Sequence, residues 1–563
     1  MRILSKTLCA VSAALSLLLM VLAFLNKRVD PVGSTVAAAA AYTVAMAALA
    51  LVLHRFVKNA VKKADNQRFT SMIWAFTAVF FGLLVAISAY MRYTPIFDLD
   101  AVYTGAINWG IRGDITSVST STFDAKTYFY YFPNNLGCAG FLALWFRLCS
   151  LVGFTDYLLA GFILCAAMCS LAFAGTALTA FELGLMYSER PKSGRIAAII
   201  SMLMFLVTPP MLFCAHMIYT DFLSMPFGIF GACLLIKAVN FAESTCAVDF
   251  VHSAYPTVPI QSENSKASNS FKTPKFRKLL LLLLASAVLT AIGIQIKATV
   301  GIAIIACAIC LVLKKDWKML LGYGSAATVL TLAFILLLNL TVYPSQLDRE
   351  KAKEMNTPTL HWVMMGLNES AGGWYNPGDY EFTRSFSDAQ ERDAAIKARI
   401  LGRLGELGFG GFFKLAGSKL GSIFSDGTAS IGDFAEQPGE NNAQPEEYAI
   451  KQSIYDFINT SGKNYETYKV MCGGMRLCSL LLFAVFAFSM LISKKSAPMY
   501  LVPLMCILGI AMFLSFWETN DRYIVNMLPF LILGGACGAE RIGSALTSKI
   551  FSRKLFALHS NKL

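Results

Sequence analysis

Residues 279–313 read LLLLLLASAVLTAIGIQIKATVGIAIIACAICLVL, and Lys297 is the one charged side chain in this run. A helix needs about 20 apolar residues to cross a bilayer. The run is therefore long enough for two short membrane spans, 279–294 and 298–313, that turn at Lys297. Runs of the same character recur from one end of the chain to the other. They predict an all-α polytopic membrane protein.

The composition agrees with this class. Of the 563 residues, 56% are hydrophobic and only 15% are charged, whereas a soluble domain carries about 25% charged residues. A soluble enzyme, a disordered chain and a secreted disulfide scaffold are excluded. Most of the 14 cysteines lie in apolar runs and none lies in 344–470. We interpret them as small packing residues, including the C-x-x-C of Cys307 and Cys310.

The apolar runs divide the chain into spans, with one region that is harder to divide. The first run, 8–25, has no small-residue cleavage site after it, so we interpret it as an uncleaved span rather than a signal peptide. For 135–183 we expect three crossings by short helices, which gives 12–14 crossings in all. The other predicted spans are 35–53, 69–90, 196–216, 222–240, 319–342, 471–492, 498–516 and 523–540.

The net charge of +13, from 48 Lys and Arg against 35 Asp and Glu, is explained by its distribution. Cytoplasmic loops of membrane proteins are rich in Lys and Arg. The long loop 344–470 holds 13 Lys and Arg against 18 Asp and Glu, so we place it outside, together with 91–134. Both termini are then cytoplasmic, and a nucleic-acid partner is not expected. The segments predicted to be cytoplasmic are 54–68, 184–195, 241–278, 314–318, 493–497 and the tail from Arg541.

The predicted organisation has five parts. Residues 1–68 form two additional N-terminal spans, and 69–343 form a transmembrane core that includes the outer loop 91–134. Residues 344–470 form an extracytoplasmic region, which is too long for a plain connection. Its part from 385 to 421 has the pattern of an amphipathic helix, and after Ser430 it is rich in Gln, Glu, Asn and Pro. Residues 471–540 are C-terminal spans, and 541–563 are a basic tail.

The polar residues that could carry chemistry lie at the predicted outer boundary. Asp98 and Asp100 follow the third span, and two such carboxylates can bind a divalent cation or supply a general base. Taken alone, such a pair is more often simply solvated. The aromatic cluster from Tyr128 to Phe132 suits an interfacial belt, or interfacial helices that admit a lipid substrate from the side.

Three further charges lie at this boundary. Asp221 is in an outer turn, where an acid must be paired or hydrated, and a plain turn residue is the alternative. Lys297 could snorkel into the headgroups or bind phosphate. Arg522 opposes the usual charge bias, and its planar fork suits phosphate recognition. Pairing of Arg522 with Glu518 or Asp521 is its alternative interpretation.

The outer region 344–470 also has candidate residues. His361, Trp362 and Asp379 could stack on a sugar ring and bind its hydroxyls, or they could belong to an ordinary folded loop. No Walker A, G-x-G-x-x-G, H-E-x-x-H or G-x-S-x-G motif occurs in a suitable context, so nucleotide chemistry on the cytoplasmic side is not expected.

Together these segments resemble the GT-C superfamily of membrane glycosyltransferases, which includes the dolichyl-phosphate-mannose protein mannosyltransferases and the lipid A aminoarabinose transferases, and especially its Gram-positive bacterial branch. The resemblance covers about residues 70–540. Two departures are Leu99, between acids that are often an adjacent Asp-Glu pair in the family, and Ala298, where relatives tend to have Pro. The segments that carry it are Pro95-Ile-Phe-Asp98-Leu-Asp-Ala-Val-Tyr103, Tyr131-Phe-Pro-Asn-Asn135, Ile218-Tyr-Thr-Asp221, Ile296-Lys297-Ala-Thr299, Pro358-Thr-Leu-His361-Trp-Val-Met-Met-Gly366-Leu, Phe424-Ser-Asp426-Gly-Thr and Arg522-Tyr523.

The resemblance implies a GT-C-like helical bundle in a bacterial cell membrane. It also implies a hexosyl- or mannosyltransferase-like enzyme that takes a sugar from a polyprenyl-phosphate carrier at the outer face, with inversion. The acceptor would be an envelope polysaccharide, a teichoic acid, a glycolipid or a protein. The competing class is a flippase or transporter for lipid-linked glycans, which should place its polar groups near the bilayer midplane.

The resemblance also implies roles for individual residues. Asp98 is preferred to Asp100 as the general base, because its spacing to Val102 and Tyr103 fits the family pattern. No cofactor is certain, and the two acids could hold Mg²⁺ or Mn²⁺. The implied substrate-binding residues are Lys297 and Arg522 on the lipid phosphate, Asp221 on the acceptor or a metal, His361, Trp362 and Asp379 in the sugar pocket, and Asp426 and Tyr523.

Overall fold

Helices make up every regular element that the structure describes, as predicted for an all-α protein. The computed structural model describes residues 2–25, 32–56, 65–115, 125–186, 191–254, 274–343, 345–434, 451–493 and 497–560. The helices of the bundle are α1 (Arg2–Leu25), α2 (Val32–Phe56), α4 (Asn66–Met91), α8 (Tyr157–Met186), α9 (Pro191–Leu206), α12 (Met225–Ala254), α13 (Pro274–Ile296), α14 (Gly301–Lys314), α15 (Trp317–Val342), α21 (Tyr465–Ile492), α22 (Val502–Phe516) and α23 (Leu528–Ser560).

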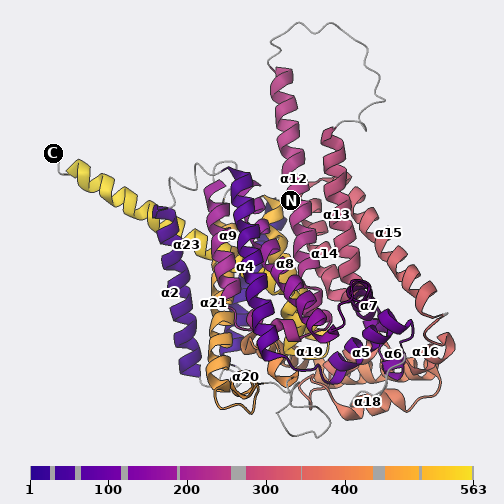
Figure 1. The fold of residues 1–563 in the computed structure, drawn as a ribbon. Coiled ribbons are helices and arrows are strands. Elements are labelled where there is room, and N and C mark those ends of the chain that lie inside the picture. Colours follow the sequence, from indigo (N-terminus) through magenta and orange to yellow (C-terminus); the bar gives the residue numbers. More distant parts are fainter. Residues whose placement is uncertain are drawn as a thin grey trace, which may run out of the picture.

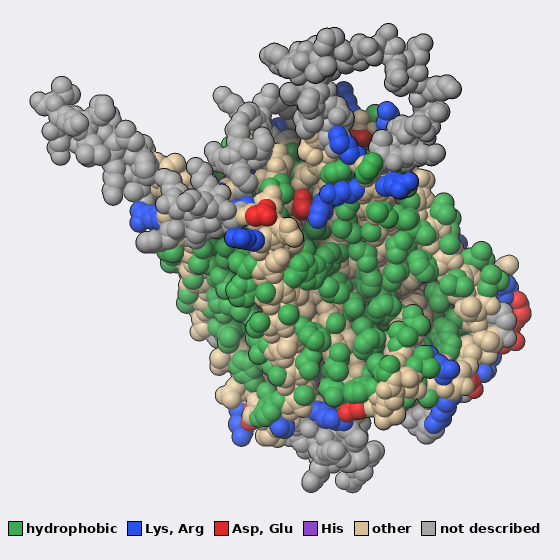
Figure 2. All heavy atoms as spheres, turned by 45° about the horizontal axis from the view of Figure 1, so that its top comes forward, with side chains coloured by type: hydrophobic (Ala, Val, Ile, Leu, Met, Phe, Trp, Pro, Cys, Tyr) green, Lys and Arg blue, Asp and Glu red, His purple; other side chains and the backbone are tan. Residues whose placement is uncertain are grey.

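The number of possible spans reaches only the lower end of the predicted range. Within the described residues, ten helices are long and apolar enough to cross a membrane. A pair bent by 65°, Lys192–Leu206 with Pro210–His216, would make an eleventh. The shorter apolar helix Ala298–Lys314 would make a twelfth, which is the lower end of the predicted 12–14. Figure 2 shows the broad band of hydrophobic side chains that these helices present, with charged side chains above and below it.

The prediction of three crossings within 135–183 is wrong. The region forms two helices, α7 (Leu136–Leu151) and α8, and only α8 is a candidate span. Arg92, after α4, pairs with Asp156, before α8, at 2.7 Å. The chain therefore enters α8 on the face where α4 ends, and α7 does not cross.

One end of the bundle, here called the loop face, carries a layer of shorter helices (Figure 1). The two predicted outer regions meet there, because Thr357 N donates to Tyr131 O at 2.8 Å and Asp348 N donates to Tyr130 Oη at 3.0 Å. The layer consists of α5 (Phe97–Arg112), α6 (Ala125–Tyr131), η2 (Pro133–Asn135), α7, α16 (Arg349–Met355), α17 (Thr359–Gly366), α18 (Pro377–Arg384), α19 (Ala389–Asp426), η6 (Ile431–Phe434) and α20 (Gln452–Ile458).

Helix α19 confirms the amphipathic helix predicted over 385–421, with one break. Gly408 has a φ of 57°, a conformation that costs a residue with a Cβ atom energy. The glycine-rich stretch 402–411 therefore bends the helix, and its second half packs against α1 and α21.

The opposite end of the bundle is here called the tail face. α12 and α13 project from it in Figure 1, as does the C-terminal part of α23. Lys6 Nζ donates to Met490 O at 3.1 Å, at the end of α21, and His54 pairs with Glu540 at 3.1 Å. Both ends of the described chain thus lie toward this face, which the sequence predicts to be cytoplasmic.

Several predicted loops lie outside the described residues. They include residues 57–64, 187–190, 255–273 and 494–496 of the basic loops and the last three residues of the tail. Residues 116–124 of the first outer loop and the polar stretch 435–450 also lie outside them.

Candidate active site

Four charged residues that the sequence singled out meet at the loop face. Arg522 Nη2 lies 3.6 Å from Asp98 Oδ2, and Arg522 Nε lies 3.7 Å from Asp221 Oδ2. Lys297 Nζ donates to the other oxygen of Asp221. The two cations therefore share one carboxylate, and a second carboxylate lies against the guanidinium group.

Each of these charges lies at or next to the end of a helix. α13 ends at Ile296, Lys297 is extended with φ −153° and ψ 118°, and η5 (Ala298–Val300) begins after it. Asp221 lies in the four-residue α11 (Thr220–Leu223), and Arg522 lies in η9 (Asp521–Met527). Asn520 caps η9 by accepting a hydrogen bond from Arg522 N at 3.1 Å. The remaining short helices of the bundle are α10 (Pro210–Phe213), η3 (Cys214–His216) and η8 (Pro498–Leu501).

The two carboxylates of this cluster differ in exposure. The side chain of Asp221 is 1% exposed, those of Arg522 and Lys297 are 8% and 13% exposed, and that of Asp98 is 44% exposed. Buried charges have to be paired, and Asp221 meets this need for both cations. Asp98 is thus the carboxylate of the cluster that a substrate can reach.

Asp100 is held differently, although it lies on the same helix. Its Oδ1 atom accepts a hydrogen bond from Thr104 Oγ1 at 2.7 Å, one turn along α5. Among the described ion pairs, Arg522 contacts Asp98 and not Asp100. No group of three or more His, Cys, Asp or Glu side chains that could hold a metal ion occurs in the described parts of the chain.

Aromatic rings and hydroxyl groups surround the two cations. The guanidinium carbon of Arg522 lies 5.0 Å from the ring centre of Tyr219, and Lys297 Nζ lies 4.8 Å from that of Tyr523. Such contacts attract cations to the ring face. Asn135 Nδ2 donates to the hydroxyl oxygens of Tyr128, at 2.6 Å, and Tyr219, at 3.0 Å. Tyr128, Asn135 and Tyr219 lie in or near the quoted motifs, but they were not predicted as site residues.

A buried acid and a buried lysine adjoin the cluster, and the sequence did not indicate their roles. Tyr523 Oη donates to Glu518 Oε2 at 2.6 Å, and burial raises the pKa of Glu518 to about 7. Lys419 Nζ donates to Gly366 O at 2.8 Å and to Trp517 O at 2.6 Å, and burial lowers its pKa to about 7. Lys419 thereby joins α19 to the end of α17 and to the segment after α22.

Trp362 belongs to an aromatic group over the same region. Its ring centre lies 6.1 Å from that of Phe132 and 6.5 Å from that of Trp517. Phe132 also lies 6.5 Å from Tyr380 in a stacked arrangement. Burial raises the pKa of Tyr380 to about 12, and the negative charge of Asp98 adds to this shift. The second outer region thus contributes Trp362 and Tyr380 to the aromatic group around Phe132 of the first outer region.

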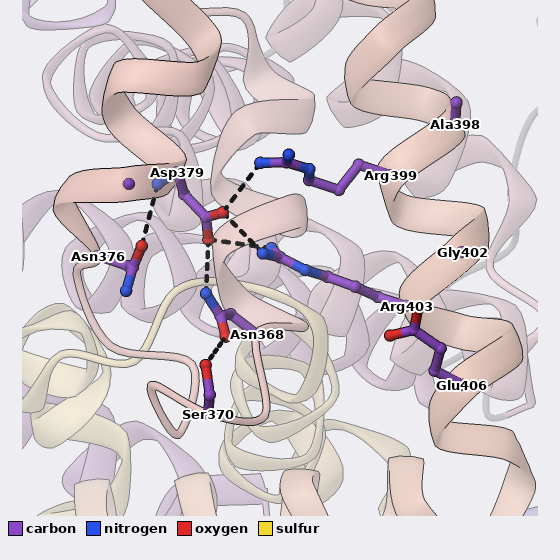
Figure 3. Close-up of a pocket in the computed structure, with 10 residues that line it drawn as sticks. Asn368, Ser370, Asn376, Asp379, Ala398, Arg399, Gly402, Arg403 and Glu406 are labelled. Carbon is purple, nitrogen blue, oxygen red and sulfur yellow. Dashed lines mark hydrogen bonds and ion pairs between the residues drawn. The ribbon is translucent and has the colours of Figure 1, made fainter.

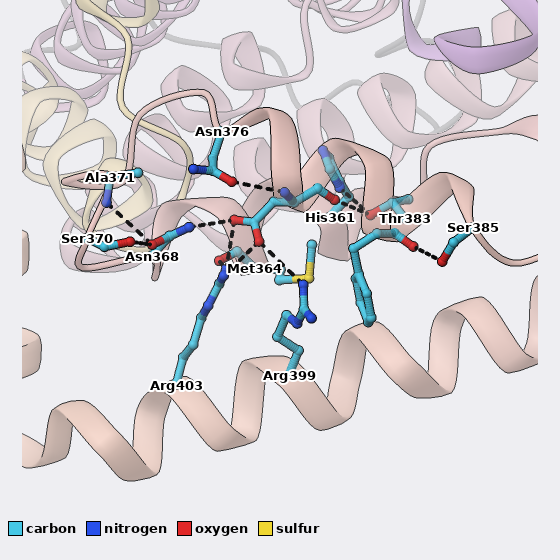
Figure 4. A network of polar contacts seen from close by, with 12 residues as sticks. His361, Met364, Asn368, Ser370, Ala371, Asn376, Thr383, Ser385, Arg399 and Arg403 are labelled. Carbon is cyan, nitrogen blue, oxygen red and sulfur yellow. Dashed lines mark hydrogen bonds and ion pairs between the residues drawn. The ribbon is translucent and has the colours of Figure 1, made fainter.

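Asp379 and His361 take no part in the charged cluster. Asp379 is 2% exposed, and its carboxylate accepts hydrogen bonds from Arg403 at 2.7 and 3.0 Å and from Asn368 Nδ2 at 2.9 Å (Figure 3). His361 is fully buried, with Nδ1 2.6 Å from Thr383 Oγ1 (Figure 4). Burial lowers the pKa of His361 to about 4, so it is neutral. His361 thus joins α17 to α18, and Asp379 joins α18 to α19.

Asp426 also lies apart from the four charges. It ends α19, and its Oδ1 atom accepts from Thr428 N at 2.7 Å and from the Thr428 hydroxyl. The next residue, Gly427, has a φ of 74°, and a Cβ atom there would meet Cys472 O at 2.5 Å. Asp426 thus supports the close approach of this turn to α21.

Comparisons with known proteins give limited likenesses. A family described as "Conserved hypothetical integral membrane protein" matches residues 267–541, and no curated protein matches the chain. The solved structure of ArnT from Cupriavidus metallidurans bound to undecaprenyl phosphate is 10% identical with a TM-score of 0.32, covering 85% of this chain and 78% of ArnT. Its apo state is 11% identical with the same TM-score, covering 84% and 78%. At these values the likeness says nothing about activity. The chain is an integral, multi-pass membrane protein built from helices.

Proposed function

We propose that this chain is a glycosyltransferase of the GT-C type, which moves a sugar from a polyprenyl-phosphate carrier to an envelope acceptor at the loop face. The observation that carries the proposal is the meeting of Asp98, Asp221, Lys297 and Arg522 at one site. These residues come from four separate parts of the chain. A lipid-linked sugar needs both a base and a phosphate site at the membrane boundary, and this cluster can supply both.

Asp98 is the general base of this proposal. Its carboxylate accepts the proton of an acceptor hydroxyl while that oxygen bonds to the anomeric carbon. The bond between the anomeric carbon and the phosphate oxygen breaks, and its electron pair leaves with the polyprenyl phosphate. A single displacement inverts the anomeric centre. A positioned base contributes about 10²–10⁴-fold to the rate.

Arg522 and Lys297 are the phosphate ligands of this proposal. The 3.6 Å between Arg522 Nη2 and Asp98 Oδ2 is longer than a good hydrogen bond, so the guanidinium group can exchange this partner for a phosphate oxygen. Charge-assisted hydrogen bonds of this kind stabilise the charge that develops on the leaving group. Asp221 is buried between the two cations, so we assign it to positioning them. This replaces the predicted contact of Asp221 with an acceptor or a metal.

The location of the cluster favours transfer over transport. A carrier should hold its substrate near the bilayer midplane, commonly at broken helices of repeated halves. The four charges instead lie at helix ends beside the loop-face helices. Trp362 and Tyr380, which both lie beside Phe132, offer rings on which a sugar can stack. We place the loop face outside the cell because the predicted cytoplasmic loops are the basic ones.

The test is transfer by the full chain in lipid nanodiscs, with a synthetic polyprenyl-phosphate sugar as donor and release of polyprenyl phosphate as readout. We expect Asp98→Asn to lower kcat by about 10²–10⁴-fold and Arg522→Ala to raise the KM of the donor. Asp100→Asn is the matched control and should stay near the wild-type rate, because Asp100 is bonded within its own helix. Near wild-type rates in both Asp variants would exclude this base. Movement of a lipid-linked glycan across vesicles without transfer would support the transporter class instead.

A further inference from the structure

A second recess lies on the loop face, between α18 and the first half of α19 (Figure 3). Its volume is about 600 Å³, which is within the range of small-molecule sites in proteins. It is distinct from the charged cluster, because Arg522 and Lys297 do not line it. The side chains that define it are Asn376, Asp379, Arg399, Arg403 and Glu406, with Gly402 as part of its floor.

The floor of this recess is open enough for a ligand to approach the helix backbone. Gly402 lies in α19 among the polar side chains that line the recess. A Cβ atom built on it would meet nothing within 4 Å. Arg399 and Arg403, on the same helix, reach from this floor toward Asp379 on α18. The recess is thus an open pocket with a glycine in its floor and polar side chains around it.

The charges of this recess are already balanced. Arg403 makes two hydrogen bonds to Asp379, at 2.7 and 3.0 Å, and Arg399 Nη1 lies 3.6 Å from the same carboxylate. Arg399 also lies flat on Phe382, with its guanidinium carbon 3.4 Å from the ring centre, and its side chain stays 37% exposed. Fixed, mutually paired guanidinium groups offer hydrogen bonds in set directions without a strong net charge.

The polar lining and the paired arginines of this recess favour some classes of ligand over others. A lipid chain needs apolar walls, and the large side chains here are amide, carboxylate and guanidinium groups. Arg403 is held by two hydrogen bonds to Asp379, at 2.7 and 3.0 Å, so it is less free than Arg522 to exchange its carboxylate for a phosphate oxygen. A chain of hydroxyl groups fits, because it can both donate to Glu406 and accept from Arg399. We propose that this recess binds an extended, hydroxyl-rich glycan or polyol chain as the distal part of the acceptor.

Helix α18 connects the recess to the candidate active site. Asp379 lines the recess, and the next residue, Tyr380, stacks with Phe132. Phe132 in turn packs against Tyr128, with 5.0 Å between ring centres. Asn135 donates to the hydroxyl groups of both Tyr128 and Tyr219, and the Tyr219 ring lies beside Arg522. A chain held in the recess can therefore extend over α18 toward the base. Binding energy from such remote contacts can position the reacting hydroxyl. This inference rests on the proposed glycosyltransferase function, since it concerns the acceptor of that reaction.

The test measures binding and not turnover. The probe is polysaccharide released from the envelope of cells that make this protein, divided by size into short and long fractions, and titrated onto the full chain in nanodiscs. We expect Gly402→Gln to weaken binding of the long fraction by about tenfold, equivalent to about 1.4 kcal/mol, and to leave the short fraction unaffected. Gly405→Gln is the matched control, because its Cβ also meets nothing within 4 Å and it does not line the recess. Ala398→Gln, on the same floor, should repeat the effect if Gly402→Gln fails to fold.

Three results would overturn the inference. The first is that Gly402→Gln and Gly405→Gln bind the long fraction equally well. The second is that the wild type does not bind the long fraction. The third is that poly(glycerol phosphate) displaces the long fraction better than a neutral glycan does. The last result would mean that the occupant is an anionic polymer. Because binding is read without turnover, failure of the transfer assay with size-dependent binding retained would reject the proposed function and not the recess.

Discussion

The substitution Asp221→Asn tests the pairing that holds the two cations of the candidate active site. It keeps the shape of the side chain and removes the negative charge. Asp221 is 1% exposed, contacts Lys297 Nζ and lies 3.7 Å from Arg522 Nε. The remaining carboxylate, Asp98, is 3.6 Å from Arg522 and 44% exposed, so it can replace Asp221 only in part. Removing one partner of a buried ion pair costs about 3–5 kcal/mol.

The same substitution should increase the response of the protein to an anion. Lys297 and Arg522 lose their shared carboxylate, so a phosphate group becomes the best available partner for both. A ligand that binds only the folded state stabilises it by about 2.7 kcal/mol at 100 times its Kd. We therefore expect Asp221→Asn to melt several degrees below the wild type without ligand. We also expect a larger rise in Tm with polyprenyl phosphate than the wild type shows.

The assay is thermal unfolding of the full chain in nanodiscs during a titration with short-chain polyprenyl phosphate. Asp379→Asn is the matched control, because Asp379 is 2% exposed and pairs with Arg403 and Arg399. It should lose comparable stability, and polyprenyl phosphate should stabilise it no more than the wild type. The reasoning is refuted if Asp221→Asn has the same Tm as the wild type without ligand. It is also refuted if polyprenyl phosphate raises the Tm of Asp221→Asn by no more than it raises that of the wild type.

Three further predictions follow from particular residues. The pKa of Glu518 is raised to about 7, so its carboxyl group is neutral below this pH and ionised above it. The added negative charge near the phosphate site should raise the donor KM about fivefold between about pH 6 and about pH 8, for about 1 kcal/mol of repulsion. Glu518→Gln should reduce this rise, and an unchanged pH profile of KM would contradict the assignment. Gly366→Ala should abolish folding, because its Cβ would lie 2.3 Å from Phe516 O, whereas Gly322→Ala, with nothing within 4 Å, should elute from size exclusion as the wild type does. A reducing agent should leave Tm unchanged, because the described cysteines are buried and free; a shift would reveal a disulfide.

Much of the bundle could be predicted because each membrane span is determined by a short continuous segment of the sequence. A helix in lipid satisfies its own backbone hydrogen bonds, so the length of an apolar run is enough to predict it. The positions of Asp98, Lys297 and Arg522 at the ends of such runs were predictable for the same reason. Their meeting was an expectation of the family resemblance, and it depends on how separate helices pack.

The path of α7 could not be read from its composition. Its residues are as apolar as those of a span, yet it stays at the loop face. Gly110 and Gly137 explain this placement, because a Cβ atom on them would meet Ala143 O at 2.4 Å and Gln295 O at 2.0 Å. These two glycines let α7 lie directly against α5 and α13. Such backbone contacts join residues that are distant in sequence, so no local sequence pattern predicts them.

The candidate site was predictable in part for a similar reason. Trp362 belongs to the aromatic group that includes Phe132, whereas His361, its neighbour in sequence, is buried and bonded to Thr383. Lys419 was missed, and Glu518 was considered only as a partner of Arg522, because an ordinary helical lysine and an ordinary boundary acid have no distinguishing pattern. Their properties come from burial and from the groups that other segments place around them.

The sequence by itself determined that the chain is a helical membrane protein, where most spans begin and end, and which charges lie at their boundaries. These properties depend on the transfer of short segments into lipid. Only the tertiary structure decided that Asp221 is shared by Lys297 and Arg522, that Asp98 stays exposed, and that Asp379 belongs to a second recess. These properties depend on distances of a few ångströms between helices far apart in the chain, and side-chain packing sets those distances.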